Sequence, residues 1–276
     1  MTDITVIKGG LGNQMFDYCF FLSLKRKSRF RLHIIEIEPS VERHYGLELF
    51  KIFHTKGAWR VALYNFLYNH HCRWYIHRHQ TIVQGNSLEY NPDYLLKRSG
   101  LYRYDGYWQS EKYFTDIKDT VRKHFRFRTD LLNERTKECA SHLCETASVS
   151  IHIRRGDYLN ESGWDKSETD FYQQAQSYIL KQEEHPVFYV FSDDMEWCRT
   201  RFKGENYRLV DWNTGNDSWQ DMYLMSQCKH NIIANSSFSW WGAWLNNNPQ
   251  KIVIAPEQWF CFSPNYDIIP IGWVTI

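Results

Sequence analysis

Short apolar runs alternate with a stretch of helical periodicity at the start of the chain. Ile4–Lys8 and Arg31–Glu38 are typical of strands, and the apolar spacing from Asn13 to about Arg29 is typical of a helix. A glycine-rich turn at residues 9–12 joins the first strand to that helix. The order strand, turn, helix, strand predicts a parallel sheet with a right-handed crossover.

The same alternation returns more clearly in the second half of the chain, after a polar helix expected at about 131–145. Strands are expected at 148–153, 187–192, 231–235 and 251–255, and helices at 167–184, 217–228 and 236–245. We therefore predict an α/β protein in two halves, residues 1–147 and 148–276.

The amino-acid composition indicates which classes of ligand the protein could bind. Aromatic residues make up 17% of the chain, which suits sugar rings as well as core packing. Lys and Arg total 33 against 32 Asp and Glu, a net charge of +1, so the chain lacks the basic excess typical of nucleic-acid-binding proteins. No nucleic-acid partner is expected, although a local cationic pocket for one small anion is compatible with this balance.

The cysteines and the N-terminus indicate the compartment. The seven cysteines are scattered and form no CxxC pair, so neither a disulfide framework nor a zinc ribbon is indicated. The opening MTDITVIKGG lacks the plan of a signal peptide, and no apolar stretch reaches about 18 residues. A cytoplasmic location is therefore expected.

The glycine turn contains the first candidate binding residues. Gly10, Gly12 and Asn13 stand between a strand and a helix, where backbone N–H groups can approach an anion. The turn does not match a dinucleotide fingerprint, because Met15 occupies the third glycine position, and this disfavours a nicotinamide-dependent oxidoreductase. The glycines alone favour a plain tight turn, and the adjacent amides of Asn13 and Gln14 add directed hydrogen bonds that a ligand could use.

The segment HIRRGDY, residues 152–158, is the most distinctive feature. It closes an apolar strand, where open α/β sheets bind ligands, and His152 and Arg154 point to the same face of that strand. The neighbouring guanidiniums of Arg154 and Arg155 suit an anion with several oxygens. Asp157 could orient an arginine or accept from a sugar hydroxyl; the alternative is an ion pair that fixes the loop.

Two further strand ends carry polar side chains. Ser192 and Asp193 follow one apolar strand, and Ser236 and Ser237 follow another at the start of a helix. Because the carboxyl ends of parallel strands meet at one sheet edge, these groups and HIRRGDY together predict a nucleoside diphosphate site. No Asp-x-Asp motif occurs, so arginine and a helix N-terminus would have to neutralise the diphosphate.

The segment Trp59–His79 is aromatic and rich in His and Arg. Its histidines and Cys72 do not have the spacing of a familiar metal site, and Arg73 and Arg78 would repel a cation, so no metal is expected there. Ordinary domain packing is the simplest interpretation. The alternative is peripheral contact with the inner face of a membrane, which would present a lipid-linked oligosaccharide acceptor.

Several motifs resemble those of the α-1,2-fucosyltransferases, family 11 of the glycosyltransferases, in its bacterial form. They are GGLGNQMF, DGYWQSEKYF, HIRRGDY, FSDD and DMYLMSQCKHNIIANSSFSWWGAWL, and they occur in the family's order over nearly the whole chain. The resemblance implies a GT-B-like fold, in which two Rossmann-like domains face a central cleft. It implies an N-terminal, mainly acceptor-side domain (1–147) and a C-terminal GDP-sugar-binding domain (148–276).

The resemblance also implies the reaction: inverting transfer of L-fucose from GDP-L-fucose to the 2-hydroxyl of a terminal β-galactose, with no metal or other cofactor. Arg154 would bind the β-phosphate and stabilise the departing GDP. His152 and Asp221 would hold guanine or its ribose. By position, it would also place Gly10, Gly12, Asn13, Ser236, Ser237 and Phe238 at the donor, and the strand-end pattern described above adds Arg155, Asp157, Ser192 and Asp193.

The general base stays open among Asp105, Glu111 and Asp17, and the leaving phosphate itself is a further proton acceptor. Two other functions also stay open. One is a fucosyltransferase of another linkage, α-1,6 or protein O-linked. The other is a non-catalytic protein that binds a nucleotide sugar, which the intact His-Arg-Arg-Asp cluster disfavours.

Overall fold

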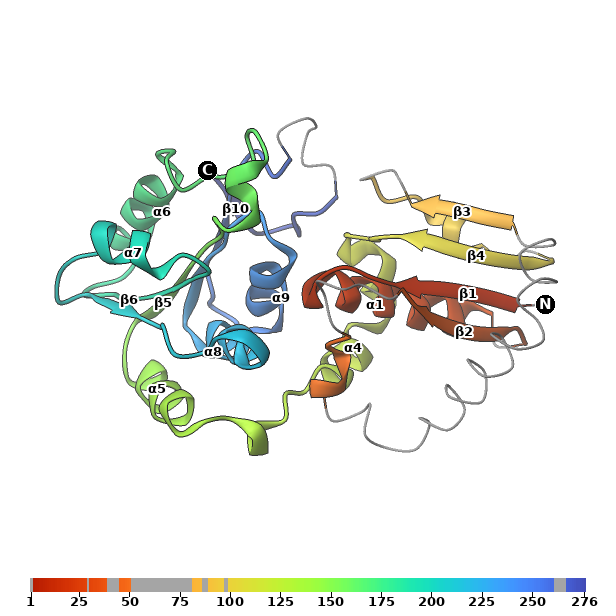
Figure 1. Ribbon diagram of the computed structural model, residues 1–276, viewed down its shortest axis with the longest axis horizontal. Helices are drawn as coiled ribbons and strands as arrows, with labels where there is room; N and C mark the ends of the chain where they lie inside the picture. The colour runs from red at the N-terminus through yellow and green to blue at the C-terminus, as the bar shows by residue number, and fades with distance from the viewer. Residues whose placement is uncertain are drawn as a thin grey trace. The chain divides into compact units, whose positions relative to one another are not determined.

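The computed structural model describes residues 2–28, 30–38, 45–50, 81–85, 89–96, 99–260 and 267–276 (Figure 1). The chain divides into two compact units. Unit 1 comprises Met1–Arg128 with Tyr266–Pro270, and unit 2 comprises Thr129–Asn265 with Ile271–Ile276.

Unit 1 contains a four-stranded parallel sheet in the order β2-β1-β4-β3. Its strands are β1 (Thr2–Ile7), β2 (Leu32–Ile37), β3 (Thr81–Gly85) and β4 (Leu101–Gly106), and its helices include α1 (Leu11–Lys27), η1 (Leu47–Leu49), η4 (Pro92–Leu95), η5 (Glu111–Ile117) and α4 (Lys118–His124). The predicted strand, glycine turn, helix and strand are confirmed. Phe16 and Phe20 of α1 are fully buried in an aromatic core, which is why this helix packs on the sheet.

Unit 2 contains a six-stranded parallel sheet in the order β10-β9-β8-β5-β6-β7. Its strands are β5 (Ser148–Ile153), β6 (Val187–Ser192), β7 (Tyr207–Leu209), β8 (His230–Ile232), β9 (Val253–Ala255) and β10 (Val274–Thr275). Its helices include η6 (Thr129–Leu131), α5 (Glu134–Glu145), η7 (Asp157–Asn160), α6 (Phe171–Leu180), α7 (Met195–Arg201), η8 (Gly215–Asp217), α8 (Trp219–Gln227) and α9 (Ser237–Leu245). All four strands predicted for this half exist, and β5 is buried along its whole length.

The boundary between the units lies between Arg128 and Thr129, not between residues 147 and 148. Helix α5 packs against α8, and its buried Cys139 and Leu143 share an apolar cluster with Leu224. Local periodicity predicted α5 but could not show which sheet it covers. The chain also returns to unit 1 near its end, where Asp267 accepts from the backbone N–H of Tyr90 at 2.7 Å.

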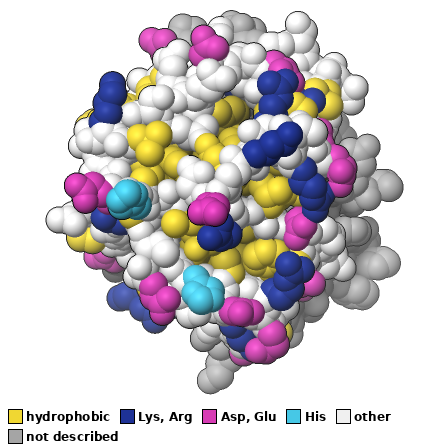
Figure 2. Space-filling model, turned by 90° about the vertical axis from the view of Figure 1, so that its left-hand side faces the viewer, with side chains coloured by type: hydrophobic (Ala, Val, Ile, Leu, Met, Phe, Trp, Pro, Cys, Tyr) yellow, Lys and Arg dark blue, Asp and Glu magenta, His cyan; other side chains and the backbone are white. Residues whose placement is uncertain are grey.

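Charged side chains of both signs are interspersed on the face drawn in Figure 2, in keeping with the net charge of +1. In the part of the chain that the structure describes, no helix is long and apolar enough to cross a bilayer. The predictions for Trp59–His79 fall outside the described residues.

Candidate functional site

Three neighbouring strand ends of unit 2 bring the predicted polar residues together. Strand β5 lies between β6 and β8, so the segments that follow these strands are adjacent. Arg154, after β5, contacts Asp193, after β6, with 2.7 Å between Nη1 and Oδ2. On the other side, the His152 ring lies 5.8 Å from that of Phe238 in α9. The predicted convergence of strand ends is confirmed.

Arg154 holds two carboxylates while its own side chain stays 23% exposed. Besides Asp193, its Nη2 donates to Asp157 Oδ1 at 2.6 Å, and its guanidinium lies over the Tyr158 ring at 5.6 Å. The guanidinium is thus oriented but accessible. A diphosphate could replace one of the carboxylates as its partner, because both kinds of anion match the guanidinium fork.

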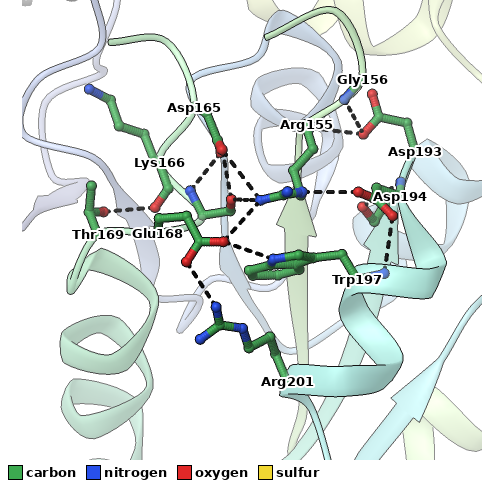
Figure 3. Close-up of polar contacts among 12 residues, drawn as sticks. Arg155, Gly156, Asp165, Lys166, Glu168, Thr169, Asp193, Asp194, Trp197 and Arg201 are labelled. Carbon is green, nitrogen blue, oxygen red and sulfur yellow. Dashed lines mark hydrogen bonds and ion pairs between the residues drawn. The ribbon is translucent and has the colours of Figure 1, made fainter. Parts of the chain in front are cut away.

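Arg155 is held almost entirely by protein groups (Figure 3). Its Nε donates to Asp194 at 3.0 Å, its Nη1 lies 3.4 Å from Asp165 and bonds the Ser167 hydroxyl, and the plane stacks over Trp197 at 4.6 Å. The side chain is 12% exposed. Arg155 was predicted to bind the donor, but the structure places it as a scaffold that ties the loop after η7 to the start of α7.

Asp193 organises the turn after β5. Its Oδ1 accepts from the backbone N–H groups of Arg155 at 2.9 Å and Gly156 at 3.3 Å, and its Oδ2 pairs with Arg154. A Cβ on Gly156 would lie 2.6 Å from Asp193 Oδ2, so a side chain at this position would displace the carboxylate. The glycine of HIRRGDY therefore permits the contact that orients Arg154.

The side chains of Ser192 and Asp194 stabilise the turn that leads into α7. Ser192 Oγ accepts from the backbone N–H of Asp194 at 2.9 Å, and Asp194 caps α7 by accepting from the N–H of Trp197 at 3.1 Å. The hydrogen bond from Trp197, with that from Arg155, lowers the pKa of Asp194. Ser192 is half-buried, and its side chain also forms a hydrogen bond with Cys198.

His152 is neutral at physiological pH. Burial, reinforced by the charge of Arg154, lowers its pKa to about 3, and the residue is 6% exposed. Its Nδ1 has no hydrogen-bond partner among the described residues. A neutral imidazole offers one donor and one acceptor, which suits a ribose or base better than a phosphate.

The start of α9 supplies the third part of the site. Ser236, one of the two serines expected at the start of this helix, is the N-cap, and its side chain accepts from the N–H of Phe238 at 3.4 Å. Ser237 and Phe238 are partly exposed in the first turn. Backbone N–H groups and the positive end of the helix dipole make this turn suitable for an anion.

Asp221 belongs to a separate network on α8. Its Oδ1 accepts from Asn213 Nδ2 at 2.8 Å, while Asn213 Oδ1 accepts from Asn133 at 2.9 Å and from the Thr136 hydroxyl at 3.1 Å. These contacts fix which end of the Asn213 amide faces Asp221. Burial raises the pKa of Asp221 to about 8 despite this hydrogen bond. A ligand that donates hydrogen bonds would favour its charged form.

The raised pKa predicts a pH effect on stability. Because the folded protein holds the Asp221 proton more tightly than the unfolded chain, the free energy of unfolding should fall as pH rises from about 4 to about 8, by at most about 1.4 kcal/mol per pH unit. Asp221→Asn removes this titration. Between pH 5 and pH 8, the urea midpoint of the wild type should therefore fall further than that of the variant. A difference between the two midpoints that is the same at both pH values would contradict the raised pKa of Asp221.

The candidates of unit 1 lie at the start of α1. Gly10 is the N-cap, with no described atom within 4 Å of where its Cβ would stand, and Gly12 is buried in the first turn. Asn13 Oδ1 accepts from Gln109 Nε2 at 2.8 Å. Gly9 adopts φ +71°, which glycine tolerates at no steric cost.

None of the three candidate bases has the environment of a general base. Burial alone would raise the pKa of Asp105, but hydrogen bonds from Lys8 at 2.5 Å and Arg103 at 2.7 Å lower it. Asp17 is completely buried, which raises its pKa well above the usual range. Glu111 pairs with Lys118 at 2.8 Å. A paired or buried carboxylate is a poor proton acceptor for a bound sugar.

Two contributors to the site were missed from the sequence. Tyr158 donates from its hydroxyl to the backbone carbonyl of Asn235 at 3.0 Å and thereby ties η7 to the segment before α9. Asn213 orients Asp221. Tyr158 belongs to the HIRRGDY motif and could have been singled out there, whereas Asn213 lies in a loop without any pattern that indicates its role.

Comparison with known proteins identifies the family to which the chain belongs. The family model for glycosyl transferase family 11 matches residues 1–276. An α-1,2-colitosyltransferase of Escherichia coli is 34% identical over 98% of this chain and 97% of its own length. The human galactoside α-(1,2)-fucosyltransferase 1 is 27% identical over 67% of this chain and 55% of its own length.

Solved structures agree on the fold. The fucosyltransferase NodZ from Bradyrhizobium matches with a TM-score of 0.54 and 13% identity, over 96% of both chains. A NodZ structure soaked with GDP-fucose matches with a TM-score of 0.51 and 14% identity, over 92% of this chain and 94% of that one. With two parallel-sheet units in the chain, this likeness confirms the expected GT-B-like class of fold. The chain belongs to glycosyl transferase family 11.

Proposed function

We propose that the protein transfers L-fucose from GDP-L-fucose to the 2-hydroxyl of a terminal β-galactose, with inversion and without a metal. The position of Arg154 is the observation that carries this proposal. It is an accessible, oriented guanidinium at the carboxyl edge of a parallel sheet, and the neighbouring strand β8 leads into the first turn of α9. Such an arrangement neutralises a departing diphosphate. The α-1,2 specificity in the names of the relatives supports the linkage.

The other groups of unit 2 suit the rest of the donor. Guanine presents two N–H donors side by side, which match the carboxylate of Asp221, and the neutral His152 can bond a ribose or base. In the transfer, the bond from fucose C1 to the β-phosphate oxygen breaks and the acceptor oxygen attacks C1 from the opposite face. Arg154 and the α9 amides stabilise the charge that GDP gains as it leaves.

The acceptor hydroxyl loses its proton late in this step. Because Asp105 and Glu111 are paired and Asp17 is buried, we propose that the departing diphosphate takes this proton through water rather than a carboxylate of the protein. Glu111→Ala should then leave kcat within a few-fold of wild type in a GDP-release assay. A loss of about 10² or more would identify Glu111 as the base instead.

Colitose is the second donor sugar to consider, since a 34% identical relative is a colitosyltransferase. Colitose is fucose without its 3-hydroxyl, so the two donors differ by one hydrogen-bonding group. A site that bonds this hydroxyl discriminates strongly against the deoxy sugar. The ratio of kcat/KM for the two GDP-sugars, measured with one acceptor, decides between them.

The direct test is GDP release from GDP-fucose in EDTA, with and without lactose. Lactose-dependent release is expected, and full activity in EDTA supports a metal-free reaction. Loss of activity in EDTA that added Mg²⁺ or Mn²⁺ restores would contradict metal independence. Binding of GDP-fucose without lactose-dependent release would overturn the proposed acceptor, and absence of any turnover with a panel of β-galactosides would favour a non-catalytic binding protein.

A further inference from the structure

The segment after β4 carries two neighbouring aromatic residues in opposite environments. The Tyr107 side chain is 43% exposed, whereas Trp108 is only 4% exposed. Trp108 has φ +44°, a left-handed conformation that is unfavourable for a bulky side chain. Non-glycine residues with this backbone conformation persist where the surroundings enforce it and cluster at functional sites.

The interior of unit 1 explains why Trp108 adopts this conformation. Its indole stacks on Phe20 with 3.9 Å between ring centroids and meets the edges of Tyr94 and Tyr113. Space for it exists because β3 ends in glycine: a Cβ on Gly85 would lie 3.0 Å from the indole. The indole Nε1 has no hydrogen-bond partner among the described residues. Apolar packing of the ring must therefore outweigh two unfavourable contributions, a buried N–H without a partner and a strained backbone.

Hydrogen bonds hold the chain on the far side of Trp108. Gln109 Nε2 donates to Asn13 Oδ1 at 2.8 Å, and the N–H of Ser110 donates to the carbonyl of Trp108 at 2.8 Å. Ser110 then caps η5 by accepting from the N–H of Lys112 at 3.3 Å. With Trp108 packed inward and Gln109 fixed to α1, the Tyr107 ring is left facing outward in a defined place.

Polar groups flank the outward ring. Lys8 Nζ lies 5.0 Å from the Tyr107 ring centroid and 2.5 Å from Asp105 Oδ1. A Cβ on Gly9 would lie 3.2 Å from Tyr107 Cε1, so the ring edge rests on the glycine turn. Lys8 and Gly9 follow β1, and Asp105 and Tyr107 stand at the end of β4, so the group lies at the carboxyl edge of the parallel sheet, where open α/β sheets bind ligands. A half-exposed aromatic ring beside a Lys–Asp pair matches a sugar, which has an apolar C–H face and a rim of hydroxyls.

We propose that Tyr107 is the stacking platform for the acceptor hexose, with Lys8 and Asp105 bonding its hydroxyls. Trp108 and Gln109 are positioning residues that fix the orientation of the Tyr107 ring. Galactose suits the platform because its C3, C4 and C5 hydrogens form one continuous apolar face. The assignment of the hexose as acceptor rests on the proposed function, whereas hexoside binding rests on the platform itself.

Tyr107→Ala and Tyr107→Phe test the platform at saturating GDP-fucose with lactose varied. We expect Tyr107→Ala to raise the lactose KM about tenfold or more while the GDP-fucose KM stays within about twofold, and Tyr107→Phe to restore most of the loss because stacking needs only the ring. Phe30→Ala, which removes an exposed aromatic side chain just before β2, is the matched control. A lactose KM unchanged in Tyr107→Ala, or an equal rise in both KM values, would overturn the proposal.

A binding measurement separates this proposal from the proposed function. Saturation-transfer NMR with methyl β-galactoside, methyl β-glucoside and methyl α-mannoside reports hexoside binding without turnover. If the wild type shows no lactose-dependent GDP release, the proposed acceptor fails, but a galactoside signal that disappears in Tyr107→Ala still supports the platform. A signal that persists in Tyr107→Ala, or none with any of the three sugars in the wild type, contradicts it.

Discussion

Replacing Arg154 with lysine should lower kcat by about 10²–10³, the loss expected when one preorganised charge-stabilising donor is removed. Arg154 is oriented by Asp157 at 2.6 Å and Asp193 at 2.7 Å, and a diphosphate that replaces one of these carboxylates would meet a guanidinium already held in place. An ammonium keeps the charge but cannot make the bidentate contact. Steady-state GDP release at saturating lactose measures the effect, and the KM for GDP-fucose should change less than kcat.

Arg199→Lys is the matched control, because Arg199 is an exposed arginine of α7 that pairs with Glu196 at 2.6 Å. Surface pairs of this kind contribute little, so this variant should retain wild-type kcat and stability. If Arg154→Lys also turns over at a near-wild-type rate, Arg154 does not carry the leaving-group charge and the donor site must be reassigned.

Arg155→Ala should instead destabilise the fold, by about 3 kcal/mol, the lower end of the range for breaking a buried ion pair. The variant would leave Asp194 and Asp165 without their cation and would expose one face of Trp197 (Figure 3). We expect the lower end of that range because Glu168, another ion-pair partner of Arg155, has a half-exposed side chain. Urea denaturation should show a lower midpoint.

Arg201→Ala provides the comparison for Arg155→Ala, since Arg201 also pairs with Glu168, at 2.9 Å, but is itself largely exposed. Its midpoint should stay close to wild type. Equal midpoints for Arg155→Ala and wild type would show that Arg155 is not a scaffold. It would then be available to the donor, as the motif alone suggests.

The sequence predicted the parts of the fold that local patterns determine. The apolar run of β5 and the Ser236 cap of α9 are short-range signals, and both elements appear where they were expected. The meeting of three strand ends followed from a general property of parallel sheets, so the neighbourhood of Arg154 and Asp193 was also predictable.

The roles that differ from expectation depend on contacts between distant parts of the chain. Arg154 and Arg155 are the same residue type in one motif, and only the fold shows that Arg155 pairs with Asp194, 39 positions away. The helix α5 was placed in the wrong half because its partner α8 lies far along the sequence. The outward Tyr107 depends on the inward Trp108, whose space comes from Gly85 in another strand.

The most direct test of the proposed reaction is NMR of the product formed from GDP-β-L-fucose and lactose. We expect one new fucosyl residue with the α configuration, linked to O2 of galactose, which shows donor, inversion, acceptor and linkage together. A β-linked fucose, or a fucose on another hydroxyl, would contradict the account.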